Sequence, residues 1–267
     1  MKRLLFLAGG ISLAIAGGAS AQSLPFSDGF ESASASGTYQ PWTGASQSTL
    51  ALEANHPHSG TQSARAFATN PGGWSDTYTM TSGTAGINGG ITSSVWVWDD
   101  NSVTQSGSTP VNAMLAFAGA NGTTTPGFGG DYAELGLISG NTAPNGLTDW
   151  VIRVASYDAA NGTTWFDTGV PRTQGFFHLQ ITADPLPSAG GDGLYHFFIN
   201  GTDVTPAVAG GLARNNVGLE WNRIGSNSSS NQDFWYDDYS VAAVPEPACL
   251  GLIGMGLAGL LIRRRRA

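Results

Sequence analysis

Lysine and cysteine are nearly missing from this 267-residue chain, and each absence excludes a class of function. Between residues 22 and 244 there is no lysine, and 18 acidic residues face 5 arginines, a net charge of −13. Such an acidic surface repels nucleic acids and anionic membranes, so neither is expected as a ligand. The single cysteine, Cys249, lies in an apolar C-terminal segment, which leaves the rest of the chain without a disulfide, a thiolate metal site or a cysteine nucleophile.

Glycine and aromatic residues are abundant instead. The chain has 38 glycines, about twice the usual share, and 10% of its residues are aromatic. This combination indicates a turn-rich all-β protein rather than a disordered one. A domain of roughly 220 residues buries about 70% of the surface that its unfolded chain exposes, so one domain at 22–243 needs no covalent cross-link.

The first 21 residues have the three parts of a secretory signal peptide. Lys2 and Arg3 precede an apolar run at 4–16, and Ala19-Ser20-Ala21 follows with small residues. The run is too short for a permanent anchor. We therefore expect a signal helix that directs export through the Sec machinery and is cleaved before Gln22.

Residues 244–267 hold a second targeting pattern. Val244, Pro245, Glu246 and Pro247 are followed by an uncharged segment at 248–262 and then by Arg263, Arg264, Arg265 and Arg266. As a helix the uncharged segment would span about 22 Å, short of the roughly 30 Å hydrocarbon core of a bilayer. Because arginines stay on the cytoplasmic side, this single transmembrane helix would hold the exported chain transiently in the inner membrane with its body outside.

This order of Pro-Glu-Pro, apolar helix and arginine cluster resembles the PEP-CTERM sorting signal of Gram-negative bacteria. The resemblance implies that a membrane exosortase recognises the tail and cuts near residues 245–247. It also implies delivery to the cell surface or to an exopolysaccharide matrix. The alternative is an ordinary tail anchor with an unrelated Pro-Glu-Pro.

The region between the targeting segments has the pattern of antiparallel β-hairpins. Apolar residues alternate with polar ones or form short runs, and no segment keeps helical spacing. Asn-Gly pairs at 88–89, 121–122, 145–146, 161–162 and 200–201 fit the positive φ angles of type I′ turns. The predicted strands cover 49–53, 63–68, 91–98, 111–117, 132–138, 150–155, 164–167, 176–182, 194–199, 217–224 and 234–241. Such a series predicts a two-sheet sandwich or a closed barrel.

Short stretches along this region resemble concanavalin A-like and carbohydrate-binding-module-like sandwiches. The segment Phe-Ser-Asp-Gly-Phe-Glu at 26–31 is similar to their opening strand, and 58–64 is similar to their second characteristic stretch. Residues 149–155, 198–201 and 234–241 are similar to their later strands. The resemblance implies an antiparallel jelly-roll sandwich whose first and last strands lie close together.

Close first and last strands would bring the carboxylates of Asp28, Glu31, Asp237 and Asp238 to one edge, where they repel one another unless a cation is present. Calcium takes about six to eight oxygen ligands, and the resembling modules hold a structural calcium in this way. We therefore expect calcium here, with carbonyl oxygens from 59–61. Asp237 and Asp238 need a bulge to face one ion, because adjacent strand residues point to opposite faces. The alternative is a set of solvated edge charges that discourages strand pairing.

Tryptophan supports a sugar-binding role, because pyranose rings stack on exposed flat aromatics surrounded by polar groups. The chain has 8 tryptophans. Trp42 and Trp74 lie in predicted loops and are the expected ligand-facing pair, although a loop tryptophan that covers the core is at least as common. Trp96 and Trp98 alternate with valines on one strand and would form an outward ladder if the valines were buried. Large apolar rings favour the interior, so we expect both tryptophans to be core residues.

No catalytic motif is present in the sequence. Glycosidases of the concanavalin A-like class place two carboxylates on one strand face, about 5 to 5.5 Å apart. The pairs Asp28/Glu31 and Asp131/Glu134 are spaced by three and would lie on opposite faces. There is no Gly-x-Ser-x-Gly elbow, no phosphate-binding loop, and no lysine partner for a lyase.

We therefore expect a non-catalytic, exported protein that adheres to or builds an extracellular polysaccharide matrix. One alternative is a lectin-like module with a defined glycan site. The other is a glycoside hydrolase or polysaccharide lyase of the same fold. The histidines, including His56 and His58 in a predicted exposed turn, have no third ligand nearby in the sequence and are assigned to no metal.

Overall fold

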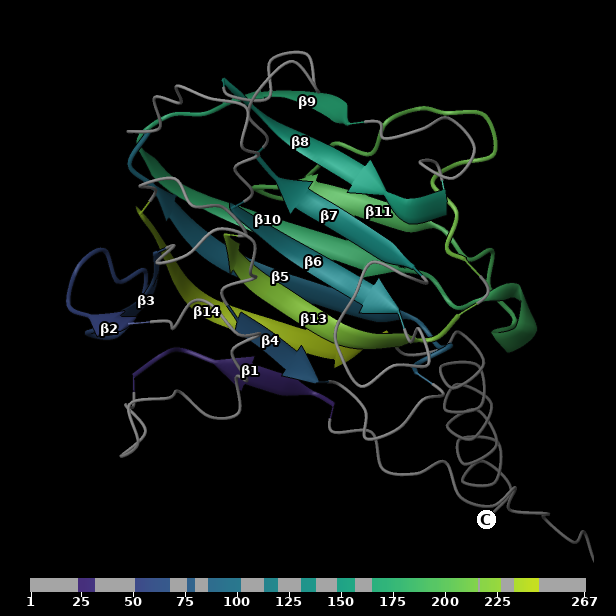
Figure 1. Ribbon diagram of the computed structural model, residues 1–267, viewed down its shortest axis with the longest axis horizontal. Helices are drawn as coiled ribbons and strands as arrows, with labels where there is room; N and C mark the ends of the chain where they lie inside the picture. Colours follow the sequence, from purple (N-terminus) through teal and green to yellow (C-terminus); the bar gives the residue numbers. More distant parts are fainter. Residues whose placement is uncertain are drawn as a thin grey trace, which may run out of the picture.

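The computed structural model describes residues 24–31, 51–67, 76–79, 86–101, 113–119, 131–137, 148–156, 165–215, 217–226 and 233–244. These residues form two antiparallel sheets packed face to face, an all-β sandwich (Figure 1). Among them, no helix is long and apolar enough to cross a membrane. The predicted signal helix, the predicted C-terminal helix, Trp42 and Trp74 lie outside the described residues.

The larger sheet has eight strands. They are β1 (Phe26–Asp28), β2 (Ala51–Glu53), β3 (Ser63–Phe67), β5 (Ile91–Asp99), β10 (Gly175–Ala183), β11 (Tyr195–Ile199), β12 (Thr202–Asp203) and β14 (Asp233–Ala243). Their order is β12-β11-β10-β5-β14-β3-β2, and β1 also pairs with β14. The first and last strands are therefore neighbours, as the sequence resemblance implies.

The smaller sheet has six strands in the order β4-β13-β6-β7-β8-β9. They are β4 (Asp76–Thr79), β6 (Ala113–Gly119), β7 (Tyr132–Gly136), β8 (Asp149–Val154), β9 (Phe166–Pro171) and β13 (Leu219–Ser226). A 3₁₀ turn, η1 (Pro187–Ala189), interrupts the connection from β10 to β11. In Figure 1 this sheet lies in front of the larger one.

Each predicted strand is confirmed within the described residues, with ends shifted by a few positions. The strand pattern misses β1, β4 and β12, because two to four residues are too few to show an alternation. The family resemblance at 26–31 does indicate β1. Asn200 and Gly201 have φ of 52° and 77° and join β11 to β12, as the type I′ prediction requires. The prediction is wrong for Asn88 and Gly89, neither of which has a positive φ. The other three Asn-Gly pairs lie outside the described residues.

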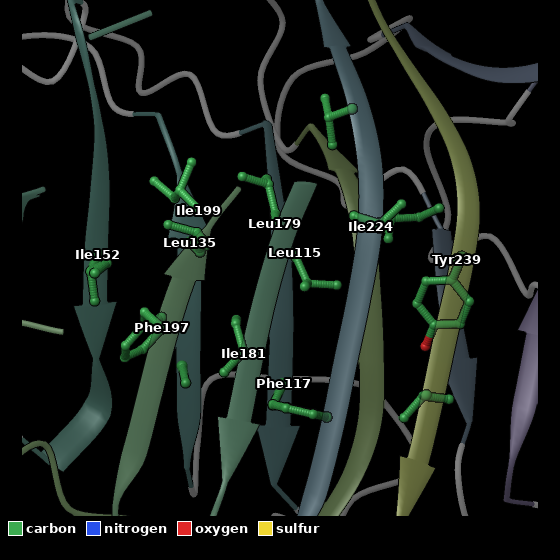
Figure 2. Close-up of a cluster of buried hydrophobic side chains, with 14 of the residues drawn as sticks. Leu115, Phe117, Leu135, Ile152, Leu179, Ile181, Phe197, Ile199, Ile224 and Tyr239 are labelled. Atoms are coloured by element: carbon green, nitrogen blue, oxygen red, sulfur yellow. The ribbon is translucent and has the colours of Figure 1, made fainter. Parts of the chain in front are cut away.

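The core lies between the two sheets and is built from alternate residues of each strand (Figure 2). Leu115, Phe117, Leu135 and Ile152 of the smaller sheet face Leu179, Ile181, Phe197 and Ile199 of the larger one. One buried polar side chain of the core is satisfied by hydrogen bonds between the sheets. Asn222 Oδ1 accepts bonds from the hydroxyls of Ser93 (2.9 Å) and Tyr239 (2.6 Å).

The expectation that the two tryptophans of β5 are core residues is wrong. The residues of this strand alternate strictly between buried and half-exposed, with Val95 and Val97 in the core. Trp96 and Trp98 consequently point away from the smaller sheet, not into the core. The valines pack in the core cluster between the sheets, whereas the outward rings are covered by side chains from other parts of the chain.

Candidate functional site

The outward face of the larger sheet carries a cluster of rings, which we call the aromatic face. Strand pairing places Trp98 opposite Phe176 on β10 and Trp235 on β14, and places Trp96 opposite His178. Directly paired residues share a sheet face, so register alone gathers these rings. Trp96, Trp98, Phe176 and His178 are half-exposed, and Trp235 is buried.

Two histidines from the turn between β2 and β3 cover the tryptophans. The His58 ring stacks on Trp96 with centroids 3.9 Å apart and 12° between the planes. The His56 ring stacks on Trp98 at 4.4 Å and 11°. Two histidines separated by one residue thus match two tryptophans separated by one residue. The turn is exposed at residues 58–61, as the sequence predicts, and its two imidazole rings lie against the sheet.

The aspartates of β14 hold this turn in place. Asp237 Oδ2 accepts hydrogen bonds from the backbone N–H groups of His58 (2.7 Å) and Ser59 (2.8 Å). Asp238 Oδ2 lies 2.7 Å from His58 Nδ1, and Asp238 Oδ1 accepts a bond from the Ser59 hydroxyl at 2.6 Å. The register shifts between Asp237 and Ser240, and Asp238 has a φ of 46°. This bulge brings both carboxylates to the turn, with Asp237 buried and the Asp238 side chain 33% exposed.

Glu31 holds the end of the same turn. Its Oε1 accepts bonds from the backbone N–H groups of Thr61 (2.8 Å) and Gln62 (3.1 Å), and its Oε2 accepts one from the Thr61 hydroxyl (2.8 Å). These bonds, the one from Gln62 first, lower the pKa of Glu31. Gly60 has a φ of +61°, and a Cβ added there would collide with the Glu31 carboxylate. Residues 56–62, which we call the histidine turn, therefore depend on glycine at this position.

The four predicted calcium ligands lie along this edge, and hydrogen-bond donors of the protein itself bond to each of them. Oxygens of Asp237, Asp238 and Glu31 face N–H and O–H donors of the histidine turn, and Asp28 Oδ1 accepts a bond from the Phe30 N–H at 2.7 Å. Within the described residues no group of three or more His, Cys, Asp and Glu could hold a metal ion. Amide donors provide the positive partner that the sequence analysis assigns to a cation. Calcium stays a prediction, which chelation can test.

Polar side chains continue the outward face beyond the rings. Ser94 and Ser240 hydroxyls lie 3.0 Å apart, and those of Thr92 and Thr182 lie 3.1 Å apart. Gln180 donates its Nε2 to the Thr182 hydroxyl at 3.4 Å. All of these residues are half-exposed. Hydroxyl and amide groups beside aromatic rings are what a sugar-binding surface requires.

The outward face of the smaller sheet carries charge instead. Strand pairing aligns Arg223, Ala116, Glu134 and Arg153 in one row across β13, β6, β7 and β8. Arg223 and Glu134 are fully buried, and burial lowers the pKa of Arg223 to about 10 against the opposing charge of Glu134. No sequence pattern predicts this row, because nothing within a single strand shows how neighbouring strands align. The predicted placement of Glu134 and Asp131 on opposite faces is confirmed, since Asp131 accepts a hydrogen bond from the core Tyr195 hydroxyl at 2.9 Å.

Comparison with known proteins identifies the C-terminal signal. A protein-family model described as the PEP-CTERM protein-sorting motif matches residues 243–266. The motif implies exosortase-sorted export to the cell surface. No curated protein matches the chain.

Several solved structures match this chain at low identity and with TM-scores below 0.5. The CBM22-1 xylan-binding domain from Paenibacillus barcinonensis Xyn10C is 13% identical with a TM-score of 0.36, covering 83% of this chain and 94% of its own. An alginate lyase mutant in complex with alginate trisaccharide is 13% identical with a TM-score of 0.41, covering 68% and 82%. A bifunctional GH43-CE protein from Bacteroides eggerthii is 11% identical with a TM-score of 0.49, covering 82% and 26%. The chain also spans only 45% of a botulinum neurotoxin serotype D binding domain. Similarity at this level concerns the fold and assigns no ligand.

Proposed function

We propose that this protein is a non-catalytic component of the cell surface or exopolysaccharide matrix that binds polysaccharide through its aromatic face. The observation that carries the proposal is the outward pair Trp96 and Trp98, each already covered by a flat ring in parallel stacking contact. A pyranose presents a flat C–H face to an indole in the same way. The sugar would replace the imidazoles when the histidine turn lifts, and the neighbouring Ser94 and Gln180 would bond its hydroxyls.

Export supplies the setting for this role. We infer that residues 1–21 are a signal peptide used by the Sec machinery, that 22–243 form the sandwich domain, and that 244–267 are the sorting signal. The signal would hold the chain briefly in the inner membrane of a Gram-negative cell until an exosortase cuts it. We further infer a jelly-roll topology of the concanavalin A-like kind, supported by a chain that alternates between the sheets from β3 to β6 and from β12 to β14.

The binding proposal can be tested on the mature, processed protein by affinity electrophoresis in gels that contain soluble polysaccharides. Trp96→Ala combined with Trp98→Ala should weaken binding roughly 5- to 100-fold, because each stacking contact contributes about 0.5 to 1.5 kcal/mol. His196→Ala is the matched control, since it removes a half-exposed ring from the same outward face at the other end of the sheet. Unchanged binding by the double variant would place the glycan elsewhere.

A lyase or hydrolase is the second candidate function, and the row of Arg223, Glu134 and Arg153 favours it. Arginine can neutralise the carboxylate of an acidic sugar, and Glu134 is a carboxylate on the same face. Both Arg223 and Glu134 are fully buried, however, which favours a packing role. Release of reducing or unsaturated ends from polysaccharides, lost on Glu134→Gln, would overturn the non-catalytic proposal.

A further inference from the structure

We infer that the aromatic face binds a neutral polysaccharide and discriminates against uronic acid polymers. The inference rests on the proposed function and adds the chemical class of its ligand. A polyuronate carries one carboxylate per sugar, so its binding surface needs arginine or lysine as the charged partner. The positions of the five arginines between residues 22 and 244 decide whether this face has one.

Two of these arginines are buried and used inside the fold. Arg172 makes a bidentate pair with Asp99, with Nη2 to Oδ1 at 2.6 Å and Nε to Oδ2 at 2.7 Å. Arg214 donates to the backbone carbonyls of Ile87 (2.9 Å) and Asp184 (2.6 Å). Neither guanidinium is available to a ligand on the outward face of the larger sheet.

Two more arginines lie on the opposite side of the sandwich. Arg153 and Arg223 project from the outward face of the smaller sheet, in register with Glu134. The Arg153 guanidinium lies over the rings of Tyr132 (4.9 Å) and Trp165 (5.4 Å). The thickness of both sheets separates these charges from Trp96 and Trp98, because stacked sheets are about 10 Å apart.

Arg65 is the one arginine beside the aromatic face. Its guanidinium lies 5.9 Å from the Trp235 ring centroid, and its Nη1 pairs with Glu53 Oε1 at 3.1 Å. Glu53 Oε2 also accepts the Trp235 Nε1–H at 3.3 Å. The charge of Arg65 is therefore matched by a carboxylate on the same surface. Segments outside the described residues cannot add a cation, because the sequence between 22 and 244 contains no further lysine or arginine.

Acidic and neutral groups make up the rest of the surface. The aspartates 237 and 238 and Glu31 border the rings, and a bound uronate would meet their charge. Apart from Arg65, the histidines are the groups of the described part of this surface that can carry a positive charge. Burial, and then the proximity of His58, lower the pKa of His178. A neutral pyranose carries no charge that these carboxylates repel. Its OH groups can donate hydrogen bonds to the carboxylates, and can donate to or accept from the hydroxyls and the amide.

Matched pairs of polymers test the inference on the full mature protein at about pH 8 and low ionic strength. Cello-oligosaccharides are compared with their C6-oxidised cellouronates, and β-1,4-mannan with polymannuronate, by titration calorimetry or affinity electrophoresis. We expect at least one neutral polymer to bind. Its uronate should bind more weakly by a factor of about ten or greater, because like charges oppose association. Equal or tighter binding of the uronate in the bound pair would overturn the inference while leaving a glycan-binding function. Binding of no polymer would defeat the proposed function itself.

A charge-adding variant makes the test specific to this face. Gln180→Arg introduces a guanidinium beside Ser94, and it should raise the ratio of uronate binding to neutral binding about fivefold or more. Ser188→Arg adds the same charge on an exposed residue of η1, at the other end of the sheet. An equal gain from Ser188→Arg would show a general charge effect and contradict selection by the aromatic face.

Discussion

The imidazole of His58 lies flat on the indole of Trp96, 3.9 Å away, while its Nδ1 is 2.7 Å from Asp238 Oδ2. One contact is a ring stack and the other is a polar contact with a carboxylate. The ring that covers the proposed sugar platform is thus held from two directions.

Glycan binding is expected to strengthen when Asp238 is replaced by asparagine, because the turn over Trp96 then loses the carboxylate that holds His58 and Ser59. Asparagine tolerates the φ of 46° at this position. His196→Gln is the control, since His196 pairs with Asp184 at 2.9 Å with similar exposure and covers no tryptophan. Affinity electrophoresis of both variants checks the prediction, and unchanged or weaker binding by Asp238→Asn would contradict it.

Replacement of Gly60 by alanine should destabilise the domain by about 1 to 3 kcal/mol, because it combines a strained φ with a collision against Glu31. Gly169→Ala separates the two causes. Gly169 has a φ of +68° but nothing within 4 Å of an added Cβ, so only the backbone cost of about 1 kcal/mol remains. Denaturant unfolding of both variants gives the comparison. Equal losses would mean that the contact with Glu31 contributes nothing.

Chelation tests the calcium prediction. Since N–H and O–H donors already occupy oxygens of Glu31, Asp237 and Asp238, EDTA should leave the melting temperature unchanged. A melting temperature that falls with EDTA and recovers with calcium would establish the metal that the sequence suggests, and would require the histidine turn to rearrange. Differential scanning calorimetry of the mature protein distinguishes these outcomes.

Asp131 makes stability depend on pH near neutrality. Burial raises its pKa from 3.8 to about 7, against hydrogen bonds from Tyr195 and Asn215. A raised pKa in the folded state means that its contribution is complete below about pH 4 and is lost as pH rises through about 7. The domain should be about 1 to 3 kcal/mol more stable at pH 5 than at pH 8 on this account. Asp131→Asn keeps both acceptor bonds, so urea denaturation of this variant should show a smaller difference between the two pH values.

Alanine replacement of Pro245, Glu246 and Pro247 tests the sorting signal in cells. We expect the variant to remain unprocessed in the inner membrane, because the exosortase would no longer recognise its tail. Cell fractionation followed by immunoblotting shows the length and location of the product. Normal release of the variant would contradict the proposed role of the motif.

Sequence alone determined the elements that depend on local chemistry. Alternation between residues 91 and 99 marks a strand whatever lies around it, and the Asn200-Gly201 pair specifies its turn through positive φ angles. The terminal targeting segments are equally local, because export and sorting machinery bind them as linear signals.

Tertiary structure alone decided which face of each strand became a surface. A period of two separates Val95 and Val97 from Trp96 and Trp98, but it does not say which pair faces the second sheet. That choice depends on packing against the core residues of the second sheet, and on His56 and His58, which come from another part of the chain to cover the rings. Side-chain packing across sheets is a long-range property, so no local pattern in β5 records it.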